Sequence, residues 1–140
     1  MTGVEGEFFS AEDADSEGEE GRFYLWRKEE IAEVLNEKAE QWAENYDITA
    51  KGNFENRNIP NLIHTADYFE TRLALETERQ KLLAFREKRP RPMKDDKVLT
   101  AWNGLMIAAM AMGARILKDD IYLQAACHAL DFINKNLRRD

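Results

Sequence analysis

The feature that most constrains this sequence is an uncharged stretch from residue 98 to residue 114, which reads VLTAWNGLMIAAMAMGA. Asp96 is a candidate helix cap before it, and Arg115 closes it. The stretch approaches the length of a membrane span, but Thr100 and Asn103 lower its apolarity. A helix that is apolar on all sides is usually surrounded by other helices. We therefore predict a helix inside a helical assembly.

A second, amphipathic helix is predicted from Asp120 to Leu137. Its apolar side chains fall on one side of the helix: Tyr122, Ala125, Ala126, Ala129, Phe132 and Ile133. Because the link at residues 118–120 is short, the two helices should be antiparallel neighbours. Such a pair is the repeating unit of a layered all-α assembly. The inner helix needs more neighbours than the chain supplies, so we expect residues 1–140 to be a single domain that is an internal piece of a larger one.

The middle of the chain also predicts helices, which makes residues 28–140 a helical region. Apolar stripes indicate two short helices between residues 28 and 46, with a break near 36–38 where Asn36 would cap the second. Residues 47–65 contain four asparagines, Gly52 and Pro60, and read as irregular connection. A charged helix is predicted over residues 67–88, with an Arg72–Glu76 pair on its surface.

The first part of the chain predicts a β-hairpin over residues 1–27. Two aromatic runs, GEFFS and GRFYLW, are flanked by glycine and read as its strands. The acidic stretch between them would be a long loop, and long loops in compact domains are often functional. The predicted fold class is therefore mainly α, with helical hairpins and a small β-hairpin near the N-terminus.

The charge balance excludes some classes of partner. The chain has 27 acidic and 20 basic side chains and a net charge of −7, which argues against nucleic acid or an anionic membrane. No signal peptide is recognisable, so a cytoplasmic location is expected. His64 and His128 are isolated and Cys127 lies among alanines, where we expect a small buried hydrophobe. No cofactor motif is present, and no cofactor is predicted.

Six of the nine residues from Glu12 to Glu20 are carboxylates, and three interpretations remain open. Asp13, Asp15 and Glu17 with the following glycine match the opening of a calcium loop, although Tyr24 stands where the bidentate glutamate should be. The acids beside Phe8, Tyr24 and Trp26 also resemble a sugar-binding surface. The third interpretation is a solvated acidic loop, which composition alone favours.

A second group of candidate site residues lies at the start of the uncharged helix. It comprises Asp95, Asp96, Trp102 and Asn103. Acidic side chains are favourable at a helix N-terminus, and a buried asparagine must be hydrogen-bonded. The basic side chains just upstream would either bind an anion or form a surface link that pairs with the acidic loop: Arg86, Lys88, Arg89, Arg91 and Lys94.

Three blocks together give the sequence a family resemblance. FFSAEDADSEGEEGRFYLW, NYDITAKGNFENRNIPNL and KRPRPMKDDKVLTAWNGLMIAAMAMGA resemble, in this order, the spermatogenesis-associated protein 20 family of thioredoxin-domain-containing proteins. The resemblance implies an internal piece of an (α/α)6 toroid of the six-hairpin glycosidase kind. It also implies a thioredoxin-like domain elsewhere in the parent chain as a partner, and no redox role for these residues.

The resemblance also implies a site in a funnel at one end of the inner helices. Asp13, Asp15 and Glu17 would line its mouth from a hairpin, with Trp26 beside them. Asp95, Asp96, Trp102 and Asn103 would stand at the funnel end of an inner helix. The implied function is carbohydrate binding or carbohydrate chemistry, inactive in this piece alone. The alternatives are a divalent-metal-binding acidic loop, or a non-catalytic helical scaffold that docks a thioredoxin-like domain.

Overall fold

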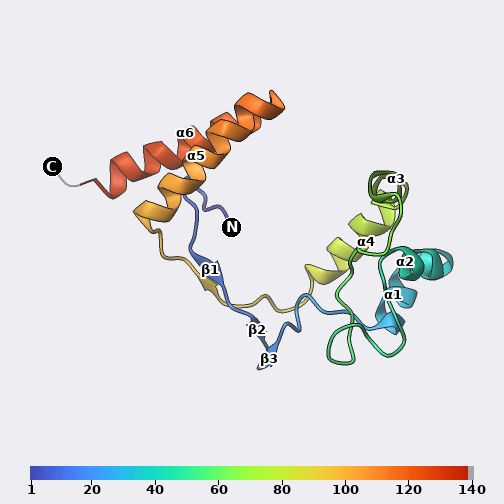
Figure 1. Cartoon of the computed structure of the whole chain (residues 1–140). Coiled ribbons are helices and arrows are strands. Elements are labelled where there is room, and N and C mark those ends of the chain that lie inside the picture. Colours follow the sequence, from blue (N-terminus) through green and yellow to red (C-terminus); the bar gives the residue numbers. More distant parts are fainter. Residues whose placement is uncertain (139–140) are drawn as a thin grey trace. The chain divides into compact units, whose positions relative to one another are not determined.

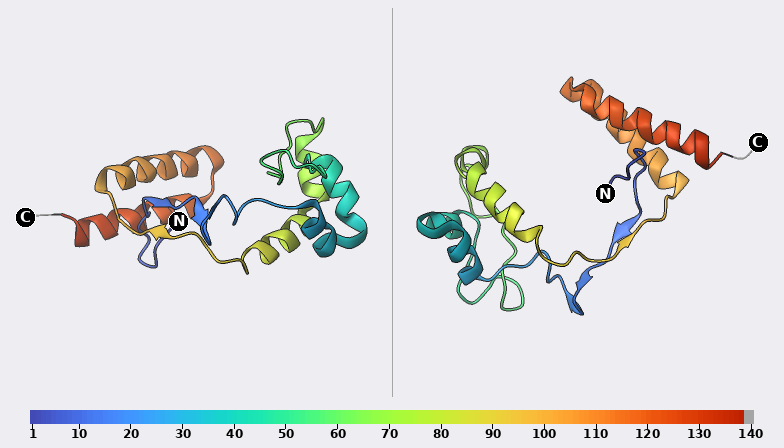
Figure 2. Two further views of the ribbon diagram at one scale, coloured as in Figure 1. Left: turned by 90° about the horizontal axis from the view of Figure 1, so that it is seen from below. Right: turned by 180° about the vertical axis from the view of Figure 1, so that it is seen from behind.

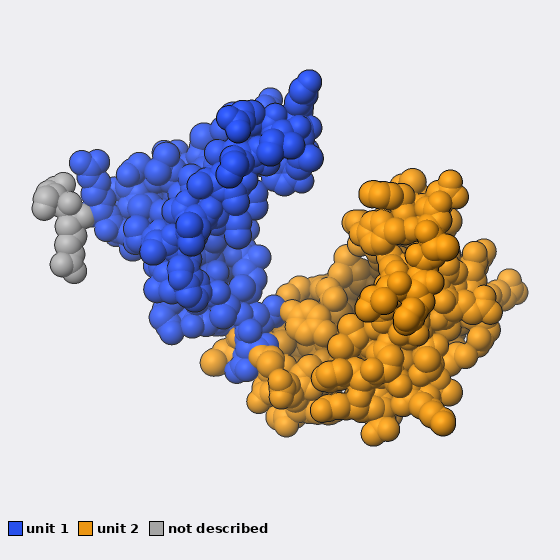
Figure 3. Space-filling view, viewed as in Figure 1, with its two compact units in different colours: residues 1–13, 94–140 blue, residues 14–93 orange. Residues whose placement is uncertain are grey.

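The computed structural model describes residues 1–138 and is 51% helical, which confirms the predicted mainly helical class (Figure 1). The chain forms two compact units (Figure 3). Unit 1 consists of residues 1–13 and 94–140, and unit 2 consists of residues 14–93.

Unit 2 contains the short helices of the middle of the chain. Its elements are β2 (Asp15–Ser16), β3 (Glu19–Glu20), α1 (Lys28–Leu35), the 3-10 helix η1 (Asn36–Lys38), α2 (Ala39–Asn45), α3 (Tyr68–Ala74) and α4 (Glu76–Arg86). The predicted break between α1 and α2 is confirmed. Asn36, however, ends α1 with a φ of 50° instead of capping α2, because its backbone N–H donates to Ala32 O.

The charged helix predicted over residues 67–88 is interrupted. Asp67 caps α3 by accepting a hydrogen bond from Glu70 N, and the helix breaks at Leu75, which is both the C-cap of α3 and the N-cap of α4. Leu75 is 2% exposed, so burial of this side chain accompanies the break. The predicted Arg72–Glu76 pair is wrong, because Glu76 binds Arg79 at 2.7 Å instead.

The core of unit 2 is formed where α1 packs against α2 and α4. It consists of Trp26, Ile31, Leu35, Ala39, Trp42, Ala43, Tyr46, Ile48, Leu75 and Leu82. The rings of Trp42 and Tyr46 stack at 3.9 Å between centroids. Burial of these apolar side chains is the main source of stability for such short helices, which would be marginal in isolation.

The predicted hairpin strands are placed incorrectly. The runs GEFFS and GRFYLW do not pair, and the acidic stretch itself supplies the strands. Within unit 2, β2 and β3 form a tight antiparallel hairpin in which Asp15 pairs with Glu20 and Ser16 with Glu19. In unit 1, β1 (Ala11–Glu12) pairs with β4 (Lys94–Asp95), which lies far along the chain.

Unit 1 is built on the two long helices α5 (Thr100–Leu117) and α6 (Asp120–Asn136), which pack side by side as predicted (Figure 2). The link turns at Lys118 with a φ of 53°, and Asp119 caps α6 by accepting from Ile121 N. Ala126 and Ala129, on the predicted apolar face of α6, are 4% and 0% exposed. Gly6 approaches α6 so closely that a Cβ would lie 2.5 Å from His128 Cβ.

Two expectations about the C-terminal helices are wrong. Leu99, not Asp96, is the N-cap of α5, and Cys127 is exposed instead of buried. The predicted enclosure of α5 is also absent within unit 1. Its large apolar side chains are exposed in the described chain: Trp102, Leu105, Met106, Met112, Ile116 and Leu117. Of the α5 residues, only Asn103 is buried.

In the part of the chain that the structure covers, residues 1–138, neither α5 nor any other helix combines the length and apolarity that a membrane crossing requires.

Candidate functional site

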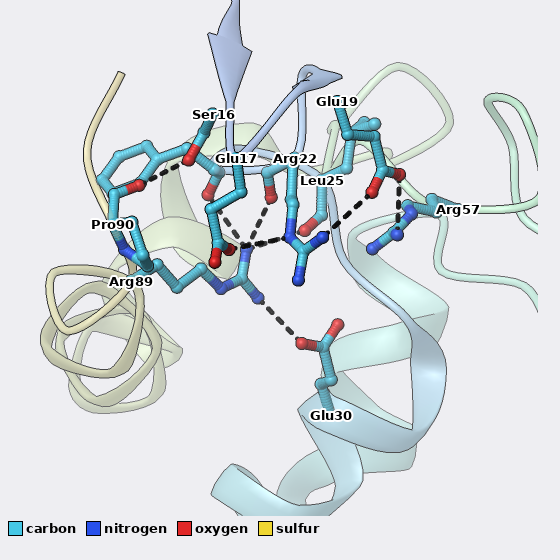
Figure 4. A network of polar contacts seen from close by, with 10 residues as sticks. Ser16, Glu17, Glu19, Arg22, Leu25, Glu30, Arg57, Arg89 and Pro90 are labelled. Atoms are coloured by element: carbon cyan, nitrogen blue, oxygen red, sulfur yellow. Dashed lines mark hydrogen bonds and ion pairs between the residues drawn. The ribbon is translucent and has the colours of Figure 1, made fainter. Parts of the chain in front are cut away.

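The β2–β3 hairpin of unit 2 positions the candidate site. Its two turn residues, Glu17 and Gly18, both have positive φ, 55° and 76°, which is the geometry of a two-residue hairpin turn that favours glycine. Ser16 is 4% exposed and its hydroxyl donates to Pro90 O at 2.6 Å, which fixes the hairpin to the segment after α4 (Figure 4). Because side chains alternate along a strand, Glu19 and Glu20 point to opposite sides of β3.

One side of the hairpin borders a cleft of about 390 Å³, which we call the aromatic cleft. It is lined by Ala14, Glu20, Gly21, Tyr24, Leu25, Phe54, Glu55 and Ile59. The rings of Tyr24 and Phe54 are 43% and 46% exposed, and Glu20 and Glu55 are exposed beside them. The cleft thus combines two accessible rings with two carboxylates.

The other side of the hairpin forms a charged cavity of about 410 Å³, which we call the arginine cavity. Four arginines line it: Arg22, Arg27, Arg57 and Arg89. Three glutamates, Glu17, Glu19 and Glu30, and the ring of Phe23 complete its wall. Glu19 therefore belongs to the arginine cavity and Glu20 to the aromatic cleft, as the alternation along β3 requires.

Ion pairs connect the carboxylates of the arginine cavity to its arginines (Figure 4). Arg22 lies 3.1 Å from Glu17 and 3.4 Å from Glu19, which also binds Arg57 at 2.8 Å. Glu30 binds Arg89 at 3.2 Å. The pairs of Glu19 hold the hairpin against the loop that carries Arg57, and the pair of Glu30 joins α1 to the segment after α4.

Arg89 has a structural role that the sequence does not reveal. Its guanidinium donates to the carbonyls of Phe23 and Leu25 at 2.9 and 2.8 Å and lies 4.2 Å from the centroid of the Trp26 ring. Burial lowers the pKa of the Arg89 guanidinium from its ordinary value, and the carboxylate of Glu30 opposes that effect. The guanidinium of Arg89 thus takes the place of backbone N–H donors for two carbonyls of the segment before α1.

The predicted site residues of unit 2 lie in three different settings. Asp15 and Glu17 are exposed on the hairpin, and Glu17 lines the arginine cavity. Trp26 is 4% exposed and belongs to the core, packed near Phe85 and beneath Arg89, and it does not line the aromatic cleft. Tyr24, two residues earlier, holds the exposed ring instead.

The predicted site residues of unit 1 are Asp13, Asp95, Asp96, Trp102 and Asn103. Asp13 and Asp96 are exposed, and Trp102 is 56% exposed on α5. A hydrogen bond from Lys97 lowers the pKa of Asp95, and the two side chains are 2.9 Å apart. Asn103 is 1% exposed.

The amide of Asn103 is fully engaged with the backbone. It accepts from Phe8 N at 2.9 Å and donates to Phe8 O at 2.8 Å and to Leu99 O at 3.2 Å. Asn103 therefore joins the N-terminal segment to α5. The predicted site residues divide between the two units, five in unit 1 and three in unit 2.

Phe54, Glu55 and Ile59 line the aromatic cleft and were not predicted. They belong to the asparagine-rich connection, where no periodic pattern marks a site. Glu55 and Asn56 have φ of 45° and 61° and form a turn that brings Phe54 next to Arg57 in an isolated bridge. The only local sign of a site in this stretch of the sequence is that Phe54 is followed closely by Asn56 and Arg57.

The calcium interpretation of the acidic stretch gains no geometric support. Across residues 1–138, no three His, Cys, Asp or Glu side chains are grouped in a way that would hold a metal ion. Glu17 instead pairs with Arg22, and Glu19 pairs with both Arg22 and Arg57.

No protein-family model matches the chain. Human spermatogenesis-associated protein 20 is 27% identical over 94% of the chain, and the aligned region is 21% of the human protein. The mouse protein of the same name is 30% identical over 89% of the chain and 20% of its own length. The relative from the rat is 27% identical over 94% of the chain. The chain spans about a fifth of the length of these relatives.

Proposed function

We propose that unit 2 binds carbohydrate in the aromatic cleft. The observation that carries the proposal is the pairing of two exposed rings, Tyr24 and Phe54, with the carboxylates of Glu20 and Glu55 around one cleft of about 390 Å³. Small-molecule sites are typically concave and largely apolar, with a few polar groups that fix orientation. The aromatic cleft has this composition and falls within the usual size range.

The chemistry of a sugar matches the lining of the cleft. The C–H faces of a pyranose are apolar and stack on aromatic rings, whereas its hydroxyls are donors that carboxylates accept. Arg86 lies 5.3 Å from the centroid of the Tyr24 ring and limits how that ring can move. A ring held in place loses less conformational entropy when a ligand binds.

Isothermal titration of the full chain with neutral mono- and oligosaccharides tests this proposal. Tyr24→Ala and Phe54→Ala should each weaken binding by about tenfold, since each removes a stacking surface worth ~1 kcal/mol or more. Phe69→Ala is the matched control, because Phe69 is a 76% exposed ring of α3 that lies outside the cleft. No heat with any sugar, or equal binding by all variants, would overturn the proposal.

A second candidate function is a helical scaffold, and the exposed apolar side chains of α5 favour it. Leu105, Ile116 and Leu117 are 73%, 69% and 62% exposed, which is unusual for a helix whose one charged residue is Arg115. Further helices of a longer chain, in an (α/α)6 toroid of the six-hairpin glycosidase kind, would cover them. The relatives, of which the chain spans about a fifth, are long enough to supply such helices.

In this scaffold function a thioredoxin-like domain is the expected partner. Mixing the full chain with a thioredoxin-like domain excised from a longer relative, followed by size-exclusion chromatography, tests that partnership. Co-elution that Leu105→Lys abolishes supports docking on α5. Separate elution of the two proteins at micromolar concentration contradicts it.

A further inference from the structure

We propose that the arginine cavity of unit 2 binds the phosphate group of a small molecule. This site lies on the opposite side of the β2–β3 hairpin from the aromatic cleft and is independent of the proposed carbohydrate site. The first observation is its charge. Four guanidinium groups face three carboxylates, which leaves one positive charge in a cavity of a protein whose net charge is −7.

The excess charge can be located on particular side chains. Each of the three glutamates already has an arginine partner, at 3.1 Å for Glu17, 2.8 Å for Glu19 and 3.2 Å for Glu30. Among the described residues, the guanidinium of Arg27 makes no ion pair, although its backbone N–H donates to Glu30 at 2.8 Å. Arg27 is exposed at the cavity and is therefore the arginine available to a ligand.

The arrangement of the arginines favours a phosphate over a carboxylate. Arg22 and Arg27 come from the segment before α1, Arg57 from the asparagine-rich loop and Arg89 from the segment after α4. Figure 4 shows Arg22, Arg57 and Arg89 around the hairpin. Donors that converge from separate segments suit a tetrahedral group with oxygens in several directions. A planar carboxylate presents only two oxygens, which one guanidinium already satisfies.

Contacts around the arginine cavity also hold its arginines in this arrangement. Ser16 fixes the hairpin to Pro90, and Arg89 is held by two backbone carbonyls and by the ring of Trp26. Arg57 has a side chain only 19% exposed, so its guanidinium is oriented before a ligand arrives. Preorganised, partly desolvated guanidinium groups bind oxyanions more strongly than free ones in water. A volume of about 410 Å³ leaves room for the molecule that carries the phosphate.

Arginine side-chain NMR on the full chain tests the proposal. We expect inorganic phosphate to shift the Nε–H signals of Arg22, Arg27 and Arg57 in a saturable way at constant ionic strength. A sugar phosphate should bind more tightly than inorganic phosphate if the ligand is an ester, and equally if free phosphate is the ligand. Acetate should produce smaller shifts than either. No saturable shift with phosphate, or the same shift with sodium chloride, would overturn the proposal.

A matched pair of variants locates the site. Arg27→Gln should weaken phosphate binding by about tenfold, because it removes one charge-assisted contact. Arg72→Gln removes another exposed arginine, on α3 and outside the cavity, and should leave affinity unchanged. Equal affinity of Arg27→Gln and the wild type contradicts the site. Tyr24→Ala changes the aromatic cleft and should not affect phosphate binding. The phosphate proposal can therefore succeed or fail independently of the carbohydrate proposal.

Discussion

At the scale of single residues, two buried asparagines show how this chain connects segments without regular sheets. Asn58 is 2% exposed, accepts from Thr49 N at 2.8 Å and donates to Thr49 O at 3.1 Å. It also donates to Trp26 O at 3.3 Å. Asn103 makes the corresponding contacts to Phe8 and Leu99 in unit 1. In both cases one amide side chain replaces the backbone partners that a strand would provide.

Replacing Asn103 by alanine should destabilise unit 1. The substitution leaves the N–H and C=O of Phe8 without their partner, and unsatisfied buried polar groups cost free energy. We expect the free energy of unfolding to fall by about 2 to 4 kcal/mol, as measured by urea denaturation. Asn136→Ala, which removes an exposed amide bonded to Phe132 O, is the control and should cost much less. Equal losses for the two variants would contradict the role of Asn103.

The lowered pKa of Glu76 should make the stability of unit 2 depend on pH. Hydrogen bonds from Arg79, and next from Gln80, lower its pKa from 4.5 to about 2. Because the pKa is lower in the folded state, this carboxylate stabilises the fold above pH 4.5, and that contribution is lost as the pH falls towards about 2. The free energy of unfolding of Glu76→Gln should therefore fall less over this window. The side chain is exposed, so salt should weaken the effect.

The carboxyl carbon signal of Glu76, followed by NMR, measures that pKa directly. A titration midpoint of about 2 agrees with the hydrogen bonds to Arg79. In Arg79→Gln the midpoint should rise, because the largest cause of the shift is removed. A wild-type midpoint close to the ordinary value of 4.5 would show that the contact does not form in solution.

At the scale of elements, the sequence predicts helices well and strands poorly. The bounds of α5 and α6 agree with the predicted ones within a few residues, because helical periodicity is a local signal. β1 pairs with β4, whose residues lie more than eighty positions away, and no local pattern indicates that partner. The two-residue turn at Glu17 and Gly18 was not predicted, because the acidic run has the composition of one long loop.

The candidate site was predictable only in part, for the same reason. The sequence indicates that acids and aromatic rings gather near residues 12–26, and the two cavities do flank that region. It does not indicate which ring is exposed. Trp26 is buried by Arg89, which is distant in sequence, whereas Tyr24 points to the cleft. Phe54 and Arg57 reach the site from a loop without any periodic pattern.

The exposed apolar side chains of α5 predict a measurable surface property. The full chain should bind the dye ANS, since exposed contiguous apolar surface favours such binding. Leu105→Lys combined with Ile116→Lys should reduce the fluorescence, while the free energy of unfolding changes by less than about 1 kcal/mol. Ala129→Lys is the contrasting control, because Ala129 is 0% exposed and a buried charge should unfold the α5–α6 pair. Comparable destabilisation by both changes would contradict the exposure of α5.

At the scale of the whole molecule, the two units have different characters. Unit 2 has a compact apolar core, two cavities and a dense set of ion pairs around one hairpin. Unit 1 is a helix pair with a short two-stranded sheet and a large exposed apolar surface. The chain matches about a fifth of each relative, so a longer protein can supply the helices that α5 lacks. We therefore propose that unit 2 binds the ligand and that unit 1 packs against further helices.

The most direct test of this account is a map of backbone amide shifts when the full chain is saturated with the oligosaccharide that binds it best. The account predicts that the shifted amides belong to the aromatic cleft, at residues 20–25 and 54–59. Shifts centred on Trp102 and the start of α5, or no shifts with any oligosaccharide, would contradict the central claim that unit 2 carries the carbohydrate site.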